Sequence, residues 1–255
     1  MTAGRTDTAA GSSTAASPRP PVLTAPDLSR LRDGAADELA AGEMVEDLWL
    51  AEADLSGAGL SAISLLSCRF SEVFADDTDL AAARLVDCRL ERLSSTYLHS
   101  PRSTWRTVEL TGSRIGAWEL YDADIESLLI EDCRLGFANL AGTGMSDVLI
   151  RGTRIDELDL SGIEAQRVRF EDCRVGTLRL RGGSLSDVDL RGLEMSVVDG
   201  VDSLAGTTIS GEQLTELAPL MAAHLGLRVK DGREPAPQSA PTRRTGDRTR
   251  GTTDI

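Results

Sequence analysis

A five-residue period runs through most of this sequence and limits the folds that the chain can adopt. Of the 30 positions spaced five apart from Leu50 to Met195, 26 are Leu, Ile, Val, Phe, Met or Trp. Because hydrophobic residues make up 41% of the chain, chance would place only about 12 there. A second column lies two residues ahead, from Leu48 to Val198, and none of its 31 members is charged. Two residues in every five are therefore expected to point inward.

This period fits neither a helix nor a strand. An α-helix repeats its face every 3.6 residues and a strand every 2, so a period of five over some 150 residues requires a turn in each unit. The chain must therefore coil, and we expect an all-β solenoid. Its core should be aliphatic, because aromatic residues make up only 4% of the chain.

The clearest units read Ala-Asp-Leu-Ser-Gly at 53–57, Ala-Asn-Leu-Ala-Gly at 138–142, Leu-Asp-Leu-Ser-Gly at 158–162 and Val-Asp-Leu-Arg-Gly at 188–192. They resemble the repeat of the pentapeptide-repeat family over about 60% of the chain. The resemblance implies a bacterial protein with a right-handed quadrilateral β-helix of four pentapeptides per coil. A coil of 20 also fits the chain itself, since Glu131–Gly136 recurs with one substitution 40 residues later.

The remaining segments predict caps and tails. We expect a disordered N-terminal tail over 1–22, an N-terminal cap with short helical turns over 23–47, the β-helix over 48–200, a C-terminal helical cap over 201–229 and a disordered tail over 230–255. Ser210 to Gln213 is typical of a helix-capping box, and Pro219 is expected to kink or split the helix that follows.

Cysteine spacing predicts one irregular coil. Cys68 and Cys88 are 20 residues apart, but Cys133 follows Cys88 by 45, and Ser95 and Ser100 occupy central inward positions between them. We therefore expect a bulged loop over 94–104 that brings all the cysteines, Cys173 included, onto one face. Buried, reduced thiols are favoured there over a disulfide or a metal site, because no cysteine pair is spaced for zinc.

Two groups of residues are candidate interaction sites. Tyr97, His99, Arg102 and Trp105 lie in or beside the expected loop, where they form either a recognition epitope or mere loop decoration. The second group is the densest acidic cluster, a candidate binding patch made of Glu72, Asp76, Asp77 and Asp79. No catalytic residue is expected, since no carboxylate is placed to orient the imidazole of His99.

The charge and the filled interior predict the class of function. A formal charge of −14 disfavours a direct nucleic-acid or anionic-membrane binder, and no apolar run is long enough for a signal peptide or membrane span. We expect a noncatalytic cytoplasmic rod that binds another protein or acts as a scaffold, without cofactor or metal.

The family resemblance implies an alternative, a DNA mimic that binds DNA gyrase and shields it from quinolones. An arginine directly follows each cysteine, which predicts a basic or neutral stripe and disfavours this alternative. A weak homodimer through the C-terminal cap and a capped monomer both remain open.

Overall fold

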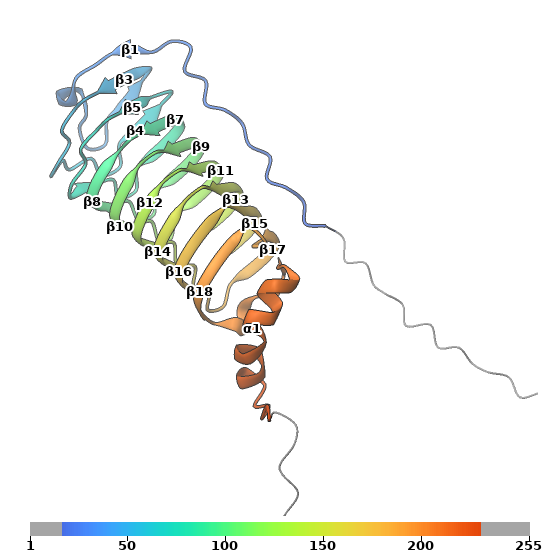
Figure 1. Cartoon of the computed structure of the whole chain (residues 1–255). Helices are drawn as coiled ribbons and strands as arrows, with labels where there is room; N and C mark the ends of the chain where they lie inside the picture. The colour runs from blue at the N-terminus through green and yellow to red at the C-terminus, as the bar shows by residue number, and fades with distance from the viewer. Residues whose placement is uncertain (1–16, 231–255) are drawn as a thin grey trace, which may run out of the picture.

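The computed structural model describes residues 17–230 and shows an elongated β-solenoid that ends in one helix (Figure 1). The strands are β1 (Arg32–Asp33), β2 (Met44–Glu46), β3 (Leu48–Ala51), β4 (Ser64–Leu66), β5 (Arg69–Ser71), β6 (Thr78–Asp79), β7 (Arg84–Glu91), β8 (Ser94–His99), β9 (Thr104–Thr111), β10 (Arg114–Glu119), β11 (Asp124–Glu131), β12 (Arg134–Asn139), β13 (Gly144–Arg151), β14 (Arg154–Asp159), β15 (Glu164–Glu171), β16 (Cys173–Arg179), β17 (Ser184–Asp189), β18 (Leu193–Asp199) and β19 (Thr207–Thr208). The helices are the 3-10 segments η1 (Ala36–Glu38) and η2 (Val201–Ser203) and the α-helix α1 (Gly211–His224).

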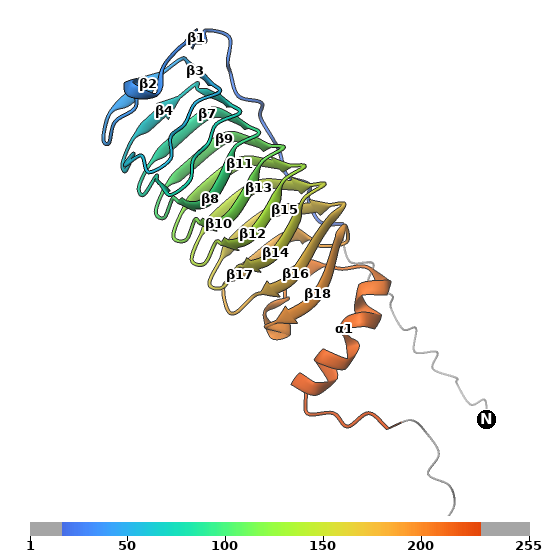
Figure 2. The same cartoon turned by 60° about the vertical axis from the view of Figure 1, so that its left-hand side comes forward.

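Each coil takes 20 residues, as the cysteine and motif spacing predicts. Strand β7 pairs in parallel with β9 so that Arg84 lies opposite Thr104, and β9 pairs with β11 so that Thr104 lies opposite Asp124. Odd-numbered strands from β1 to β19, with β2 and β4, form a 12-stranded sheet, and even-numbered strands from β6 to β18 form a 7-stranded sheet (Figure 2). The expected β-solenoid is therefore confirmed.

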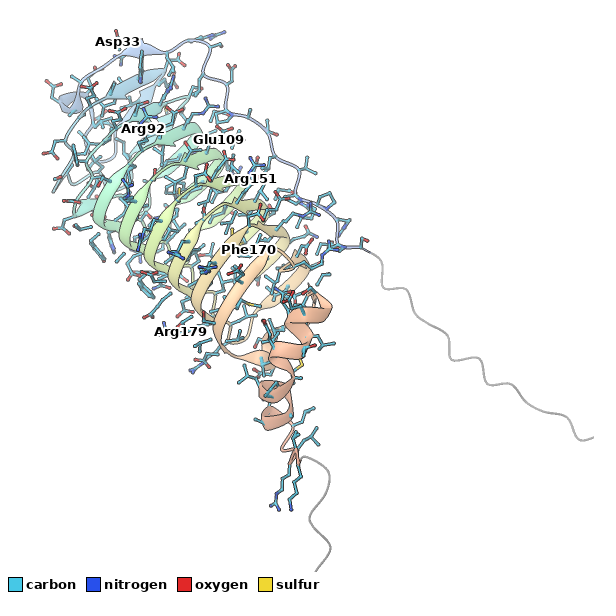
Figure 3. All side chains as sticks on the ribbon, viewed as in Figure 1. Asp33, Arg92, Glu109, Arg151, Phe170 and Arg179 are labelled. Atoms are coloured by element: carbon cyan, nitrogen blue, oxygen red, sulfur yellow. The ribbon has the colours of Figure 1, made fainter. Side chains whose placement is uncertain are left out.

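The two inward columns fill the rod. The side chains expected at the centre are buried at Leu50, Leu55, Phe70, Leu90, Leu120, Ile130, Phe170 and Leu190. Leu160 is an exception, because it is only half-buried. Figure 3 shows Phe170 within the rod and the polar side chains projecting from its outside.

Most coil corners use a left-handed backbone. One corner column, in which every residue has a φ between 52° and 58°, consists of Asp47, Ser67, Asp87, Thr107, Ser127, Asp147, Arg167 and Asp187. Short polar residues such as Asp tolerate this conformation better than most side chains do. The corner residues therefore project their side chains in a row along the rod.

The loop predicted over 94–104 does not exist. Strand β8 pairs regularly with β10, and Ser94 lies opposite Arg114. Ser95 and Ser100 are buried at their central positions instead of marking a bulge. Ser100 accepts a hydrogen bond from the fully buried indole of Trp118, and Ser95 donates its hydroxyl to the carbonyl of Ala75. The fully buried indole of Trp105 pairs with Ser103.

The cysteines consequently lie on two faces, and the prediction of a single stack is wrong. Cys88 lies in register with Val108 on the 12-stranded sheet. The amide of Cys133 instead donates to Thr153 Oγ1, and Cys173 opens strand β16 of the 7-stranded sheet. All four thiols are buried and free.

The segment before the rod departs from the predicted helical cap. The N-terminal segment forms the two-residue strand β1 and one three-residue 3-10 turn, η1, rather than a helical cap. Residues 17–22, expected to be disordered, lie against the rod, because Arg19 and Val22 hydrogen-bond to it. The predicted C-terminal tail falls, apart from Lys230, outside the described residues.

Helix α1 covers the last coil, as predicted. The Ser210 hydroxyl accepts from the Gln213 amide, and the Gln213 side chain donates to the carbonyls of Leu190 and Leu193 at 2.7 Å each. Leu217 is buried against the coil. The helix runs unbroken through Pro219, so of the kink or split predicted there, the split is wrong. Within residues 17–230 no helix has the length and hydrophobicity needed to span a bilayer.

Candidate functional site: an acidic and aromatic patch

Tyr97 and His99 lie together on the outer side of β8. Both side chains are half-buried, the Tyr97 hydroxyl lies 3.3 Å from His99 Nδ1, and the ring centroids are 6.0 Å apart. They alternate with the inward Leu98, since successive side chains of a strand point to opposite faces. The two rings thus form one aromatic surface.

The acidic cluster joins this surface from the preceding coil. Asp79 lies in register with His99, and the Asp77 amide donates to the carbonyl of Tyr97. On the following coil Glu119 also lies in register with His99. The two candidate sites predicted separately are therefore one site, the acidic–aromatic patch, made of Asp76, Asp77, Asp79, Tyr97, His99 and Glu119.

The carboxylates of this patch are not neutralised by arginine. None of its four acidic residues forms an ion pair with any residue of the described range 17–230. Elsewhere acidic residues pair across coils, as Glu131 does with Arg151. Burial raises the pKa of Tyr97, and the nearby carboxylates, of which Glu119 contributes most, raise it further. The patch therefore presents concentrated negative charge around an apolar surface, which suits a basic partner.

Three of the predicted site residues lie outside this patch. Trp105 is fully buried and donates its indole N–H to Ser103 Oγ at 2.8 Å, so it contributes to no surface epitope. Glu72 forms an ion pair at 2.8 Å with Arg92, which lies at the same corner of the next coil. Arg102 is exposed at a corner with φ 55°.

Sequence reasoning missed Phe74, whose side chain is 58% exposed at the edge of the patch. It lies two residues before Asp76, at a position where the five-residue pattern points outward. An apolar residue at an outward position was the signal that could have identified it. Exposed aromatic side chains commonly anchor protein interfaces.

An arginine ladder lies on the same 7-stranded sheet as Tyr97 and His99 and was also missed. Arg114, Arg134, Arg154 and Arg174 lie in register on β10, β12, β14 and β16, and all are exposed. Within the described residues only Arg174 of these four has an acidic partner, Glu194. The expected stripe of cysteine-adjacent arginines is wrong, because Arg69 and Arg89 lie on the other sheet.

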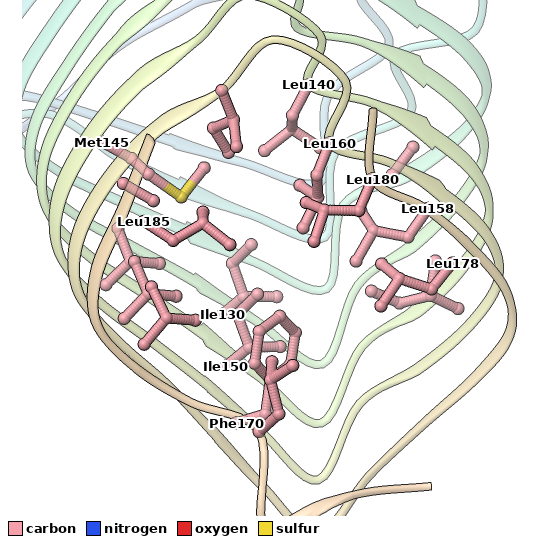
Figure 4. Close-up of a pocket in the computed structure, with 18 of the residues that line it drawn as sticks. Ile130, Leu140, Met145, Ile150, Leu158, Leu160, Phe170, Leu178, Leu180 and Leu185 are labelled. Atoms are coloured by element: carbon pink, nitrogen blue, oxygen red, sulfur yellow. The ribbon is translucent and has the colours of Figure 1, made fainter. Parts of the chain in front are cut away.

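The spaces found inside the rod are small and apolar. Figure 4 shows the apolar side chains that surround one of them, among them Ile130, Ile150, Phe170, Leu160 and Leu180. That space holds about 30 Å³, roughly the volume of one water molecule. In the part of the chain that the structure describes, no three His, Cys, Asp or Glu side chains are grouped to hold a metal ion.

No protein-family model matches the sequence, and no curated protein is significantly similar to it. Several solved structures are similar to this chain, with low TM-scores. A trypsin-treated variant of QnrB1, a plasmid-mediated fluoroquinolone resistance protein, is 14% identical with a TM-score of 0.34, over 74% of this chain and 99% of that chain. HetL, a pentapeptide repeat protein involved in heterocyst differentiation regulation from the cyanobacterium Nostoc, is 15% identical with a TM-score of 0.25, over 68% and 93%. Scores this low extend no partner or site to this chain.

The chain's own repeat decides its class. Five-residue units, two inward columns and a 20-residue coil recur from β3 to β17. The chain is a β-solenoid built of five-residue repeats. Its inward positions pack the core, and the acidic–aromatic patch is the candidate site on its outer sides.

Proposed function

We propose that this β-solenoid is a noncatalytic protein-interaction rod whose acidic–aromatic patch binds a basic segment of another protein. The observation that carries the proposal is the register of Asp79, His99 and Glu119 on three consecutive coils, beside Tyr97. Carboxylates without an ion-pair partner around half-buried rings attract Lys and Arg side chains through charge and cation–π contacts. We place its action in the cytoplasm, where free thiols such as its four cysteines stay reduced.

A photo-crosslinking experiment tests this function. Tyr97 is replaced by a benzoyl-phenylalanine in the full chain, which keeps an aromatic ring at the patch. The matched control carries the same probe at Phe137, which lies in the same column two coils further along the rod. We expect a partner to crosslink at position 97 and not at 137, and to be displaced by a Lys- and Arg-rich peptide. Replacing Asp76, Asp77 and Asp79 with Asn should abolish capture.

Equal crosslinking at both positions, or capture that survives the three Asn substitutions, would reject the patch as the binding site. The gyrase-binding DNA mimic makes a different prediction, inhibition of supercoiling by the purified protein at micromolar concentration. The arginine ladder disfavours it, since four exposed arginines on one side do not imitate a phosphate backbone.

The C-terminal end supports a second contact, a weak end-to-end homodimer. Leu214, Leu220, Leu225 and Leu227 of α1 and the segment after it are between 43% and 69% exposed, so the cap leaves apolar surface uncovered. Such surface favours association. Sedimentation at increasing protein concentration tests the dimer, and replacing Leu220 and Leu225 with Glu should keep the protein monomeric. A wild-type protein that stays monomeric at high concentration rules it out.

A further inference from the structure

Residues 17–31 cross the outside of the rod, from its C-terminal coils back to β1 (Figures 1 and 2). We call this segment the strap. Arg19 donates its amide to Asp187 Oδ1 at 3.0 Å and its Nε to Oδ2 at 2.7 Å. The amide of Val22 donates to Asp147 Oδ1 at 2.9 Å, and that of Thr24 donates to Ser127 Oγ at 2.9 Å. The strap is thus held by side chains of three different coils.

All three acceptors belong to one corner column, in which residues recur every 20 positions. Asp187, Asp147 and Ser127 have φ values of 54°, 57° and 58°, so the same left-handed corner aims each side chain at the strap. We call the column from Ser127 to Asp187 the corner track. Because the acceptors are set by the coil spacing, their separation along the rod is fixed.

The strap advances along this track at the pace of an extended proline-rich chain. From Arg19 to Val22 three residues cross two coils, and from Val22 to Thr24 two residues cross one coil. With coils about 4.8 Å apart, this is roughly 2.4 to 3.2 Å per residue. A polyproline II helix rises about 3.1 Å per residue, so ligand and track match in spacing.

Burial alternates along the strap in the same way. Pro18 and Pro26 are buried against the rod, and Pro21, Leu23 and Leu28 are half-buried, whereas the residues between them are exposed. Prolines also restrict the free segment to extended conformations, which lowers the entropy lost on docking. Apolar contacts and directional hydrogen bonds therefore act together, as they do in peptide-binding grooves.

The electrostatics of the track support the same geometry. Hydrogen bonds from Arg19, the backbone amide first, hold the pKa of Asp187 below its ordinary value. The pKa of Asp147 is lowered mainly by its hydrogen bond with Arg167, and the amide of Val22 contributes. Both carboxylates are thus ionised acceptors, and Asp187 accepts hydrogen bonds from both the side chain and the backbone amide of one arginine.

We propose that the corner track is a peptide-binding site and that residues 18–28 are its built-in ligand. The partner that it fits is an extended, proline-rich segment of another protein with an arginine opposite Asp187. Such a segment binds only when the strap leaves the track, so the tethered strap lowers the apparent affinity of the track for the partner segment. The corner track and the acidic–aromatic patch lie on different parts of each coil. Position 127 belongs to the track, and position 137, ten residues or half a coil further along, is in the column of Tyr97. The proposal therefore does not depend on the proposed function.

The experiment uses the full chain with a strap that can no longer dock. Replacing Val22 and Thr24 with Pro removes the two donating amides but keeps an extended chain, and Arg19→Glu repels Asp187. A fluorescent peptide with the wild-type sequence of residues 17–29 is the probe. We expect it to bind this triple variant at least about tenfold more tightly than the wild type, whose tethered strap competes at an effective concentration near millimolar.

Two controls separate the track from nonspecific binding. Adding Asp147→Asn and Asp187→Asn to the triple variant should remove peptide binding, whereas adding Asp156→Asn, on another side of the rod, should not. A peptide with the same three substitutions as the strap should not bind either. Equal binding to wild type and triple variant, absence of binding at about 1 mM peptide, or binding indifferent to Asp147 and Asp187 would each overturn the proposal. Circular dichroism verifies that every variant keeps the β-solenoid.

Discussion

Two buried tryptophans depend on the serines that the sequence interpretation assigned to a loop. Trp118 donates its indole N–H to Ser100 Oγ at 2.8 Å, and Trp105 donates to Ser103 Oγ at 2.8 Å. The Ser103 hydroxyl in turn donates to the Ser100 carbonyl at 2.6 Å. Both indole side chains are 0% exposed, so water cannot replace a lost acceptor.

Ser100→Ala should therefore leave the Trp118 N–H unsatisfied and lower the free energy of unfolding by about 1–3 kcal/mol. Ser103→Ala should cost at least as much, because it removes an acceptor for Trp105 and also the bond to the Ser100 carbonyl. The double variant should lose less than the sum of the two, because the serines share one network. A loop residue would show no such losses.

Urea unfolding followed by tryptophan fluorescence measures these losses. A Trp49→Phe background removes the one partly exposed tryptophan, so the emission reports on Trp105 and Trp118 alone. Ser186→Ala, at an exposed position, is the matched control and should change the stability by less than about 0.5 kcal/mol. If Ser100→Ala and Ser103→Ala both behave like this control, the proposed hydrogen bonds do not support the core.

Three further predictions concern single positions. Burial raises the pKa of Cys133 to about 11. The stability that this thiol contributes is therefore complete below pH 9 and is lost between pH 9 and about 11. In pH-dependent unfolding, wild type should lose about 2–3 kcal/mol more than Cys133→Val over that window, and parallel curves for the two proteins would contradict this. Gly200→Ala should destabilise the end of the rod by more than about 2 kcal/mol, because φ is 100° and a Cβ would clash with the Leu180 carbonyl oxygen. Gly57→Ala, with φ 71° and open space around the new Cβ, should cost about 1 kcal/mol in thermal melts, and equal losses for the two variants would contradict the clash. Gln213→Leu removes both hydrogen bonds to the last coil, and hydrogen exchange should then show α1 opening more often than in wild type, while unchanged protection would refute its capping role.

The sequence predicted the solenoid and its core because both follow from one local rule repeated about thirty times. A position in the five-residue unit determines whether a side chain packs or is solvated, and neighbouring coils repeat the environment. The same rule misled at Ser95 and Ser100, because a hydroxyl in an inward column suggests a break unless its hydrogen-bond partner is known. That partner is the Ala75 carbonyl for Ser95 and the Trp118 indole for Ser100. Trp105 was assigned to a surface for the same reason.

The candidate site was partly predictable. Asp79 and Tyr97 were both identified as candidate site residues. That they lie on one surface follows only from the regular 20-residue register, which the predicted loop over 94–104 would have interrupted. The strap was not predictable, because its composition is typical of disorder and its contacts join residues up to 168 positions apart. No local pattern encodes a partner that distant.

The strap also gives the rod an order of assembly. A repeat array is held by contacts between adjacent coils, so it can begin to fold while the ribosome is still adding residues. Arg19 leaves the ribosome early, but its acceptor Asp187 belongs to one of the last coils to be made. The strap can therefore dock fully only on a finished rod. Once docked, it couples the stabilities of coils that otherwise contact only their neighbours. A chain truncated before Asp187 would lack the contact with Arg19. A docked Arg19 therefore distinguishes a completed solenoid from a truncated one.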